Sequence, residues 1–132
     1  GLDVFYSATE PQEIIAVHPN TSMLVPTGLR FGVPHGYMLE VKNRSSVAAK
    51  LNLVVGACVI DSGYDGEVFI NVHNIGRDSR VIQDGDKIAQ LVMMPVVHFQ
   101  PQENTEGTLY DYPKTISNRG TGALGSTDAS TK

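Results

Sequence analysis

The chain has 132 residues, which suits one domain with a modest core and is too short for two cores of ordinary size. Hydrophobic residues make up 41% and charged residues 18%, a balance typical of a soluble globular protein. The formal net charge of -4 argues against non-specific attraction to nucleic acid or to an anionic membrane. Phosphate binding would therefore have to rely on locally placed cations and N–H groups.

Cysteine usage and hydropathy indicate a reducing interior. The single cysteine, Cys58, cannot form an intramolecular disulfide. No apolar run approaches the roughly 18 residues of a membrane helix, and the first residues lack the order of a secretion signal. We expect a soluble, intracellular protein of the cytoplasm or nucleus that contacts neither membrane nor nucleic acid. A viral source stays open.

Short strands dominate the predicted elements. Apolar side chains alternate in residues 37–42 and again in residues 68–73, the period of a strand with one wet face. Residues 88–97 are apolar on both faces and follow a hairpin signal at Asp84-Gly85, so they predict a central or interface strand. Further turn formers interrupt the chain at residues 26–28, 34–36 and 65–66.

Helical patterning is confined to one short segment. Residues 46–50 suggest a turn of helix, with Ser45 or Ser46 as its cap. The remaining pattern of many short strands with regular turn signals predicts an all-β sandwich or barrel.

The last part of the chain has the composition of a tail. From about Gln100 the apolar pattern gives way to Pro, Asn, Thr, Gly and Ser, so we predict a β-domain over residues 1–112 and an arm over residues 113–132. Residues 120–125 match Gly-x-Gly-x-x-Gly, but that motif needs a long following helix and only seven residues remain. The glycines let N–H groups converge on an anion, beside a cation and two hydroxyls from Arg119, Ser126 and Thr127. A disordered terminus is the alternative.

Arg44-Ser45-Ser46 stands at the end of a predicted strand and the start of a turn. Arginine offers a planar donor fork and serine a short hydroxyl, which together can hold a phosphate oxygen. A surface turn with an N-cap serine is the ordinary alternative.

Asp61 directly follows an apolar run, so its carboxylate is expected at a strand end, partly shielded yet near water. Such a carboxylate can orient and deprotonate a water molecule. Tyr64 offers a flat face for a sugar ring, and the glycines of this segment allow close backbone approach to a base edge. The alternative is an acidic turn beside a packed tyrosine.

Asp86 and Gln90 are predicted to share one face of a strand, where an aspartate steadies an arginine and a glutamine binds phosphate oxygens. A charged hairpin followed by a core strand is the alternative. The four histidines are spread singly, so we expect no zinc site. A divalent ion would be held mostly by substrate phosphates and one carboxylate, as is typical of Mg²⁺.

Taken in order, these segments resemble the five motifs of the trimeric dUTPase family and cover nearly the whole chain. The motifs fall at residues 1–4, 44–46, 56–66, 85–92 and 119–127. The resemblance implies a jelly-roll-like β-fold, a homotrimer, and hydrolysis of dUTP to dUMP and pyrophosphate with Mg²⁺. It also implies sites at subunit boundaries. One chain supplies the first, second and fourth motifs, a neighbour supplies the third, and the arm of the remaining chain closes the lid.

The resemblance also implies roles for single residues. Asp61 would activate the water that attacks the α-phosphorus, and Tyr64 would pack under the deoxyribose and exclude a ribose 2′-hydroxyl. The uracil edge would be read by the backbone around Gly56, Cys58, Val59 and Ile60. Ser45 would contact the α,β-bridging region, and Arg44, Ser46 and Gln90 would bind the phosphates, so that Ser45 and Gln90 count as catalytic residues beside Asp61. Asp86 would brace Arg44, and Asp3 would hold the waters of Mg²⁺. The lid would consist of Arg119, Leu124, Gly125, Ser126 and Thr127.

Four positions depart from the family pattern. Leu124 replaces a phenylalanine that stacks on uracil, so we expect a weaker KM or a slower rate. Asp128 replaces a glycine and brings a negative charge near the triphosphate. Asp65 stands where a basic or small residue is usual, and Cys58 stands where some members have glycine.

Two other functions remain compatible with the residues. A dCTP deaminase relative shares the fold and an Arg-Ser-Ser element but needs its own glutamate-centred site. A binding or signalling module could keep the nucleotide pocket and act through protein partners.

Overall fold

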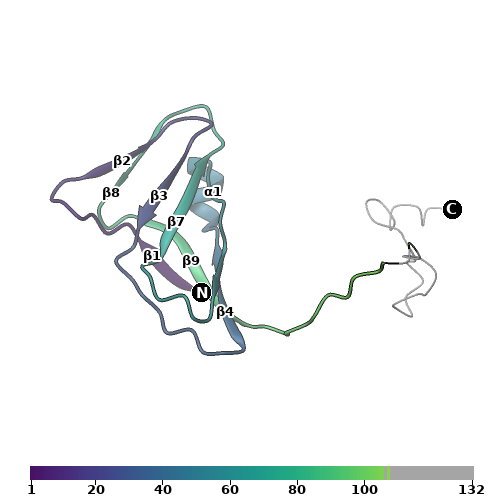
Figure 1. Cartoon of the computed structure of the whole chain (residues 1–132). Coiled ribbons are helices and arrows are strands. Elements are labelled where there is room, and N and C mark those ends of the chain that lie inside the picture. The colour runs from purple at the N-terminus through teal and green to yellow at the C-terminus, as the bar shows by residue number, and fades with distance from the viewer. Residues whose placement is uncertain (106, 108–132) are drawn as a thin grey trace. The chain divides into compact units, whose positions relative to one another are not determined.

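The computed structural model describes residues 1–105 and residue 107. One compact unit spans Gly1–His98, and its elements can be followed in Figure 1. In chain order they are β1 (Leu2–Phe5), β2 (Ile14–Val17), β3 (Ser22–Pro26), β4 (Tyr37–Lys42), α1 (Ser45–Leu51), β5 (Leu53–Val55), β6 (Val59–Asp61), β7 (Phe69–Asn74), β8 (Arg80–Gln83) and β9 (Lys87–Pro95). The predicted all-β fold with one short helix is confirmed.

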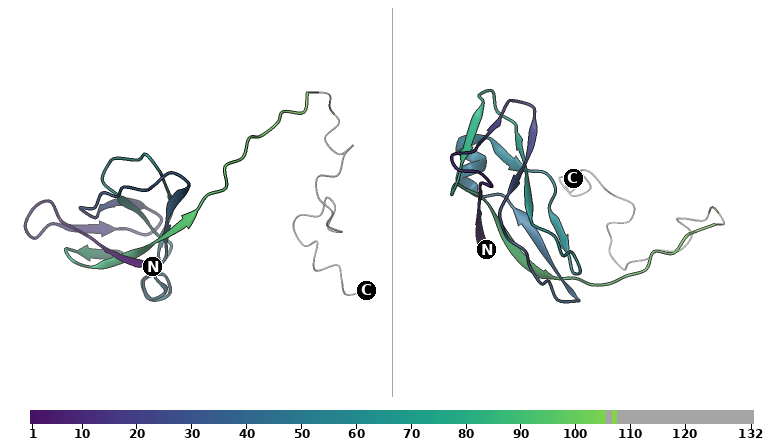
Figure 2. Two further views of the ribbon diagram at one scale, coloured as in Figure 1. Left: turned by 90° about the horizontal axis from the view of Figure 1, so that it is seen from below. Right: turned by 60° about the vertical axis from the view of Figure 1, so that its left-hand side comes forward.

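The strands form three antiparallel sheets around one interior. Their orders are β1-β9-β4-β6, β3-β7-β5 and the pair β2-β8. Figure 2 shows the strands of the unit arranged around a common interior, and a single cluster of buried side chains draws on all three sheets. The arrangement is a sandwich of open sheets and not a closed barrel.

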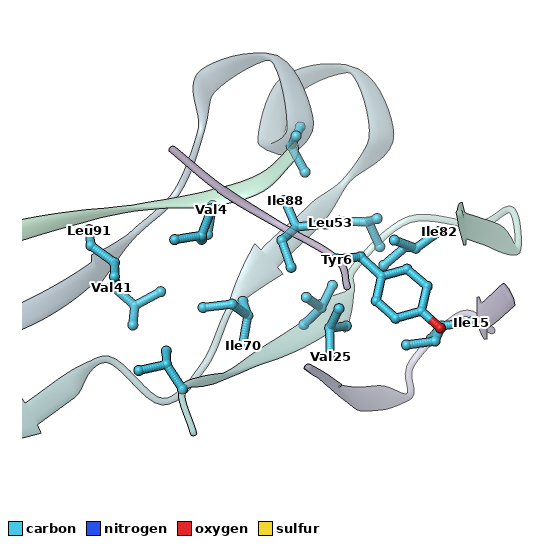
Figure 3. Packing of buried hydrophobic residues seen from close by; sticks show 14 of the residues in the cluster. Val4, Tyr6, Ile15, Val25, Val41, Leu53, Ile70, Ile82, Ile88 and Leu91 are labelled. Atoms are coloured by element: carbon cyan, nitrogen blue, oxygen red, sulfur yellow. The ribbon is translucent and has the colours of Figure 1, made fainter. Parts of the chain in front are cut away.

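The alternation seen in the sequence decides which side chains enter this interior. On β4 the inward positions are Leu39 and Val41, and on β7 they are Ile70 and Val72. Figure 3 shows side chains from different sheets meeting here. Burial of each aliphatic side chain of this kind contributes about 1.5–3 kcal/mol. The predicted strands at residues 37–42 and 68–73 are therefore confirmed, the second shifted by one residue.

The helix begins at Ser45, so its N-cap lies one residue before the first of the two predicted cap residues. Arg44 is the N-cap residue in extended conformation, it makes no side-chain cap bond, and its carbonyl accepts the amide of Ala48 at 3.0 Å. The prediction of a Ser45 or Ser46 cap is therefore wrong. Arg44 points its side chain toward β1 instead, and Ser45 opens the first turn.

Two turn predictions also change. Asp84-Gly85 does form a turn, but β8 pairs with β2 while β9 pairs with β1 and β4, so the turn joins two sheets and is not a hairpin. Gly85 has φ of +84° there and donates its amide to the Tyr6 carbonyl at 2.8 Å, which fixes the crossing point. At residues 65–66 the chain only bends, at Gly66, and the turn of this loop lies at Ser62 and Gly63.

The apolar strand predicted at residues 88–97 is β9, which occupies a central position between β1 and β4. Ile88, Ala89 and Leu91 are buried, whereas Met93, nearer the end of the strand, is half exposed. Among the described residues, no helix has the length and apolarity to cross a membrane.

Candidate active site

Three predicted site residues from three separate motifs meet at one edge of the large sheet. Register places Asp3 of β1 opposite Gln90 of β9, and Gln90 in turn opposite Lys42 of β4. Arg44, which follows β4, donates from Nε to Oδ1 of Asp3 at 3.2 Å. Gln90 donates from Nε2 to the carbonyl of Asn43 at 2.9 Å. Asp3, Arg44 and Gln90 are called the anion cluster below.

The partner of Arg44 differs from the prediction. Asp3, and not Asp86, forms its ion pair, and Lys87 Nζ lies 3.7 Å from the other oxygen of Asp3. The Asp86 carboxylate accepts the amide of Gln83 at 2.8 Å and so closes its own turn. Asp86 precedes β9 and therefore does not share a strand face with Gln90. Arg44 and Asp86 still border one pocket of about 340 Å³ beside α1.

A second pocket, also of about 340 Å³, contains the predicted base and the predicted sugar platform. Asp61 ends β6, as predicted, but it is solvent-exposed and not partly shielded. Tyr64 lies beside it with 47% of its surface exposed. The apolar lining includes Val59 and Ile60 and also two side chains that the sequence did not single out, Leu24 and Phe69. We call this site the sugar pocket.

Tyr64 is held by its own loop. Its hydroxyl donates to the carbonyl of Glu67 at 2.6 Å. The ring lies across Gly66, where an added Cβ would come within 2.6 Å of the tyrosine oxygen. Gly66 is thus needed so that the ring can fold back, and Tyr64 lines the pocket.

Gly56 is also packed tightly, and its close neighbours are side chains of β7. A Cβ at this position would overlap the ring of His73 and the amide oxygen of Asn71, which lie 2.6 Å apart in a hydrogen bond. The Gly56 amide donates to the Asn71 carbonyl at 2.9 Å, opposite β7. Neither His73 nor Asn71 was predicted, because only strand register brings them to the glycine.

The other predicted contacts lie on the surface or outside the described residues. Ser45, Ser46, Cys58 and Val59 are exposed, and Ile60 is half-buried. Arg119, Leu124, Gly125, Ser126, Thr127 and Asp128 are not among the described residues.

The anion cluster and the sugar pocket lie apart within one chain. Asp61 is opposite Met38 on β4, whereas Gln90 is opposite Lys42 at the other end of that strand. Four residues of strand span about 13 Å. A carboxylate that activates a water for attack must lie within hydrogen-bond reach of that water. Within one chain, Asp61 and Gln90 therefore stand at different levels along β4.

The fold and these two groups of residues define an all-β protein with an Asp–Arg–Gln cluster and a separate carboxylate–aromatic pocket. The dUTPase family model matches residues 2–125. The deoxyuridine 5'-triphosphate nucleotidohydrolase of Chlamydia muridarum is 34% identical over 129 residues, which cover 96% of this chain and 83% of that protein. The chain belongs to the dUTPase family.

Two solved structures have a similar fold. The dUTPase of Staphylococcus bacteriophage 80alpha with dUpNHpp has a TM-score of 0.74 at 25% identity, covering 93% of this chain and 82% of that one. The dUTPase of Staphylococcus aureus phage phi11, described with a structural Mg(II) ion, has a TM-score of 0.67 at 26% identity, covering 80% and 82%.

Proposed function

We propose that the chain hydrolyses dUTP to dUMP and pyrophosphate. The observation that carries the proposal is the sugar pocket, in which Asp61 and Tyr64 line one cavity of nucleoside size. The name of the Chlamydia relative and the dUpNHpp bound to the phage 80alpha enzyme support the choice of substrate.

Asp61 acts as the general base. Its exposed carboxylate accepts a proton from a water molecule, and the water oxygen attacks the α-phosphorus in line. A new P–O bond forms as the bond to the α,β-bridging oxygen breaks, and pyrophosphate leaves. Tyr64 packs under the deoxyribose, where a ribose 2′-hydroxyl would meet the ring. The backbone around Gly56, Cys58, Val59 and Ile60 reads the uracil edge.

The anion cluster binds the phosphates. The ion pair between Arg44 and Asp3 holds the Arg44 side chain, which is only 26% exposed, at a fixed position beside β1. Gln90 and the hydroxyls of Ser45 and Ser46 add neutral donors at the same edge. Donors that are already in place stabilise charge on the leaving pyrophosphate without reorganisation.

The donor set suits a magnesium ion that is held chiefly by substrate phosphates. Among the described residues, no group of three or more His, Cys, Asp or Glu side chains is placed to hold a metal. The Asp3 carboxylate lies beside Arg44, a proposed phosphate ligand, and so could bind the waters of such an ion. When bound, Mg²⁺ would neutralise charge that develops on the phosphates.

The separation of the two half-sites supports a homotrimeric enzyme. In a ring of three subunits, the sugar pocket of one chain can complete the anion cluster of its neighbour. Exposed apolar side chains around the pocket and on β9, at Leu24, Val59 and Met93, suit contact with another subunit. We propose that residues 113–132 form the lid, in which Arg119, Ser126 and Thr127 bind the outer phosphates.

Pyrophosphate release from dUTP, dCTP, dTTP and UTP with Mg²⁺ tests this function. The full chain is compared with a chain that ends before Arg119. We expect turnover of dUTP alone and its loss on truncation. Tight dUTP binding without turnover would instead favour the signalling module, and release of ammonia from dCTP would favour the deaminase.

A further inference from the structure

A surface arginine outside all five motifs forms an ion pair and a hydrogen bond with the loop that contains Tyr64. Arg30 lies in the loop after β3, and Asp65 lies between β6 and β7. Arg30 Nη2 is 2.5 Å from Oδ1 of Asp65, and its Nε donates to the Asp65 backbone carbonyl at 2.9 Å. One planar guanidinium thus holds both the side chain and the main chain of a single residue, a geometry that a lysine cannot reproduce.

The same two loops are joined at a second place. The Val68 amide donates to the Leu29 carbonyl at 2.8 Å, and the Thr27 hydroxyl donates to the Val68 carbonyl at 2.7 Å. These bonds fix the end of the Tyr64 loop next to β7. Arg30 fixes the loop three residues earlier, at its exposed tip.

The tip is where the tyrosine ring is oriented. Asp65 stands between Tyr64 and Gly66, and the ring lies across Gly66 with its hydroxyl bonded to the Glu67 carbonyl. The orientation of the ring therefore depends on the backbone between Tyr64 and Glu67.

We propose that Arg30 and Asp65 form a clamp that positions Tyr64 and so determines discrimination between deoxyribose and ribose. The inference rests on the proposed function. The side chains of Arg30 and Asp65 are 65% and 90% exposed, so the clamp contributes little to global stability.

The test compares how well UTP and dUTP are handled when the clamp is opened. The KM for dUTP and the inhibition constant of UTP as a competitor are measured for the unmodified chain, Arg30→Ala and Arg30→Lys. In Arg30→Ala the ratio of the UTP constant to the dUTP constant is expected to fall about two- to fivefold, the upper part of the range for one exposed ion pair. Arg30→Lys keeps the positive charge but loses the planar guanidinium, so its ratio should lie between those of the unmodified chain and Arg30→Ala.

Asp65→Ala sharpens the expectation, because it removes the carboxylate but keeps the carbonyl that accepts from Arg30 Nε. Its effect should be smaller than that of Arg30→Ala, and the double variant should be no worse than Arg30→Ala alone. Additive losses would show that the two residues act independently and would overturn the clamp.

Arg80→Ala is the matched control. Arg80 also bonds backbone carbonyls, those of Leu51 at 3.2 Å and Lys50 at 3.5 Å, but lies outside the sugar pocket. It should leave the ratio unchanged. An unchanged ratio in Arg30→Ala, or an equal fall in Arg80→Ala, overturns the clamp while dUTP hydrolysis stands. If the unmodified chain neither binds nor hydrolyses dUTP, the proposed function fails, and the clamp with it.

Discussion

The anion cluster and the sugar pocket are built in different ways. The cluster comes from neighbouring strands in register, and each of its side chains is bonded to protein: Arg44 to Asp3, and Gln90 to the Asn43 carbonyl. The sugar pocket depends on a loop, and its two chemical residues, Asp61 and Tyr64, are exposed. The proposed phosphate half is thus set by the sheet, while the proposed sugar half depends on loop contacts. Each prediction below perturbs one half or the support beneath it.

The largest effect is expected at the base. Asp61→Asn should keep dUTP binding and lower kcat by about 10²–10⁴-fold, the usual contribution of a general base. Single-turnover kinetics and dUTP binding by calorimetry separate the two quantities. Asp78→Asn is the control, an exposed aspartate that does not line the sugar pocket. A near-normal kcat in Asp61→Asn would remove Asp61 from the mechanism.

A change in the anion cluster should act on binding. Arg44→Ala removes a phosphate ligand and leaves Asp3 without this cation, so the KM for dUTP should rise by about 10–100-fold, since a hydrogen bond to a charged group is worth ~1.5–3 kcal/mol. Binding of dUMP, which has one phosphate, should weaken less. Equal weakening for dUTP and dUMP would place Arg44 away from the outer phosphates.

The close packing of Gly56, in the segment proposed to read the base, gives a prediction about the stability of the fold. Gly56→Ala forces a Cβ into His73 and Asn71 and should destabilise the fold by ~1–3 kcal/mol. Gly32→Ala is a matched control, because a Cβ at Gly32 meets nothing within 4 Å. Thermal unfolding of both variants tests the contact. Equal Tm values would show that the strand relaxes to admit the methyl group.

The smallest effect concerns Tyr6 and appears only in alkali. Burial, with the nearby carboxylates of Glu13 and Asp84, raises the pKa of Tyr6 above its ordinary value of 10.0. Above that pH the unfolded chain releases a proton that the folded chain retains, so stability falls as pH rises. Tyr6→Phe should remove this part of the slope. Urea unfolding between pH 8 and pH 11 measures it, and parallel curves for the two proteins would contradict the assignment.

Local patterns predicted the elements well, for a physical reason. The alternation at residues 37–42 and 68–73 predicts which face of each strand is exposed to solvent. This prediction needs only the order of residues within the strand itself. The helix near Ser46 was found in the same way, but its start was not, because Arg44 is held by Asp3 and not by a local cap. The turn at Asp84-Gly85 was recognised from its residues, whereas its role as a link between two sheets was not.

The sequence by itself determined the family, the all-β class and three of the residues that line the sugar pocket with Asp61, namely Val59, Ile60 and Tyr64. Only the tertiary structure decided which of these residues meet. Strand order and register are non-local, and they gave Arg44 its partner Asp3 and placed His73 over Gly56. The fold also joined Arg30 to Asp65. Register set Asp61 about 13 Å along β4 from the level of Gln90. The periodicity of a strand predicts which of its side chains are buried, but it does not predict which strand pairs with it. Contacts between segments distant in the sequence therefore depend on the fold.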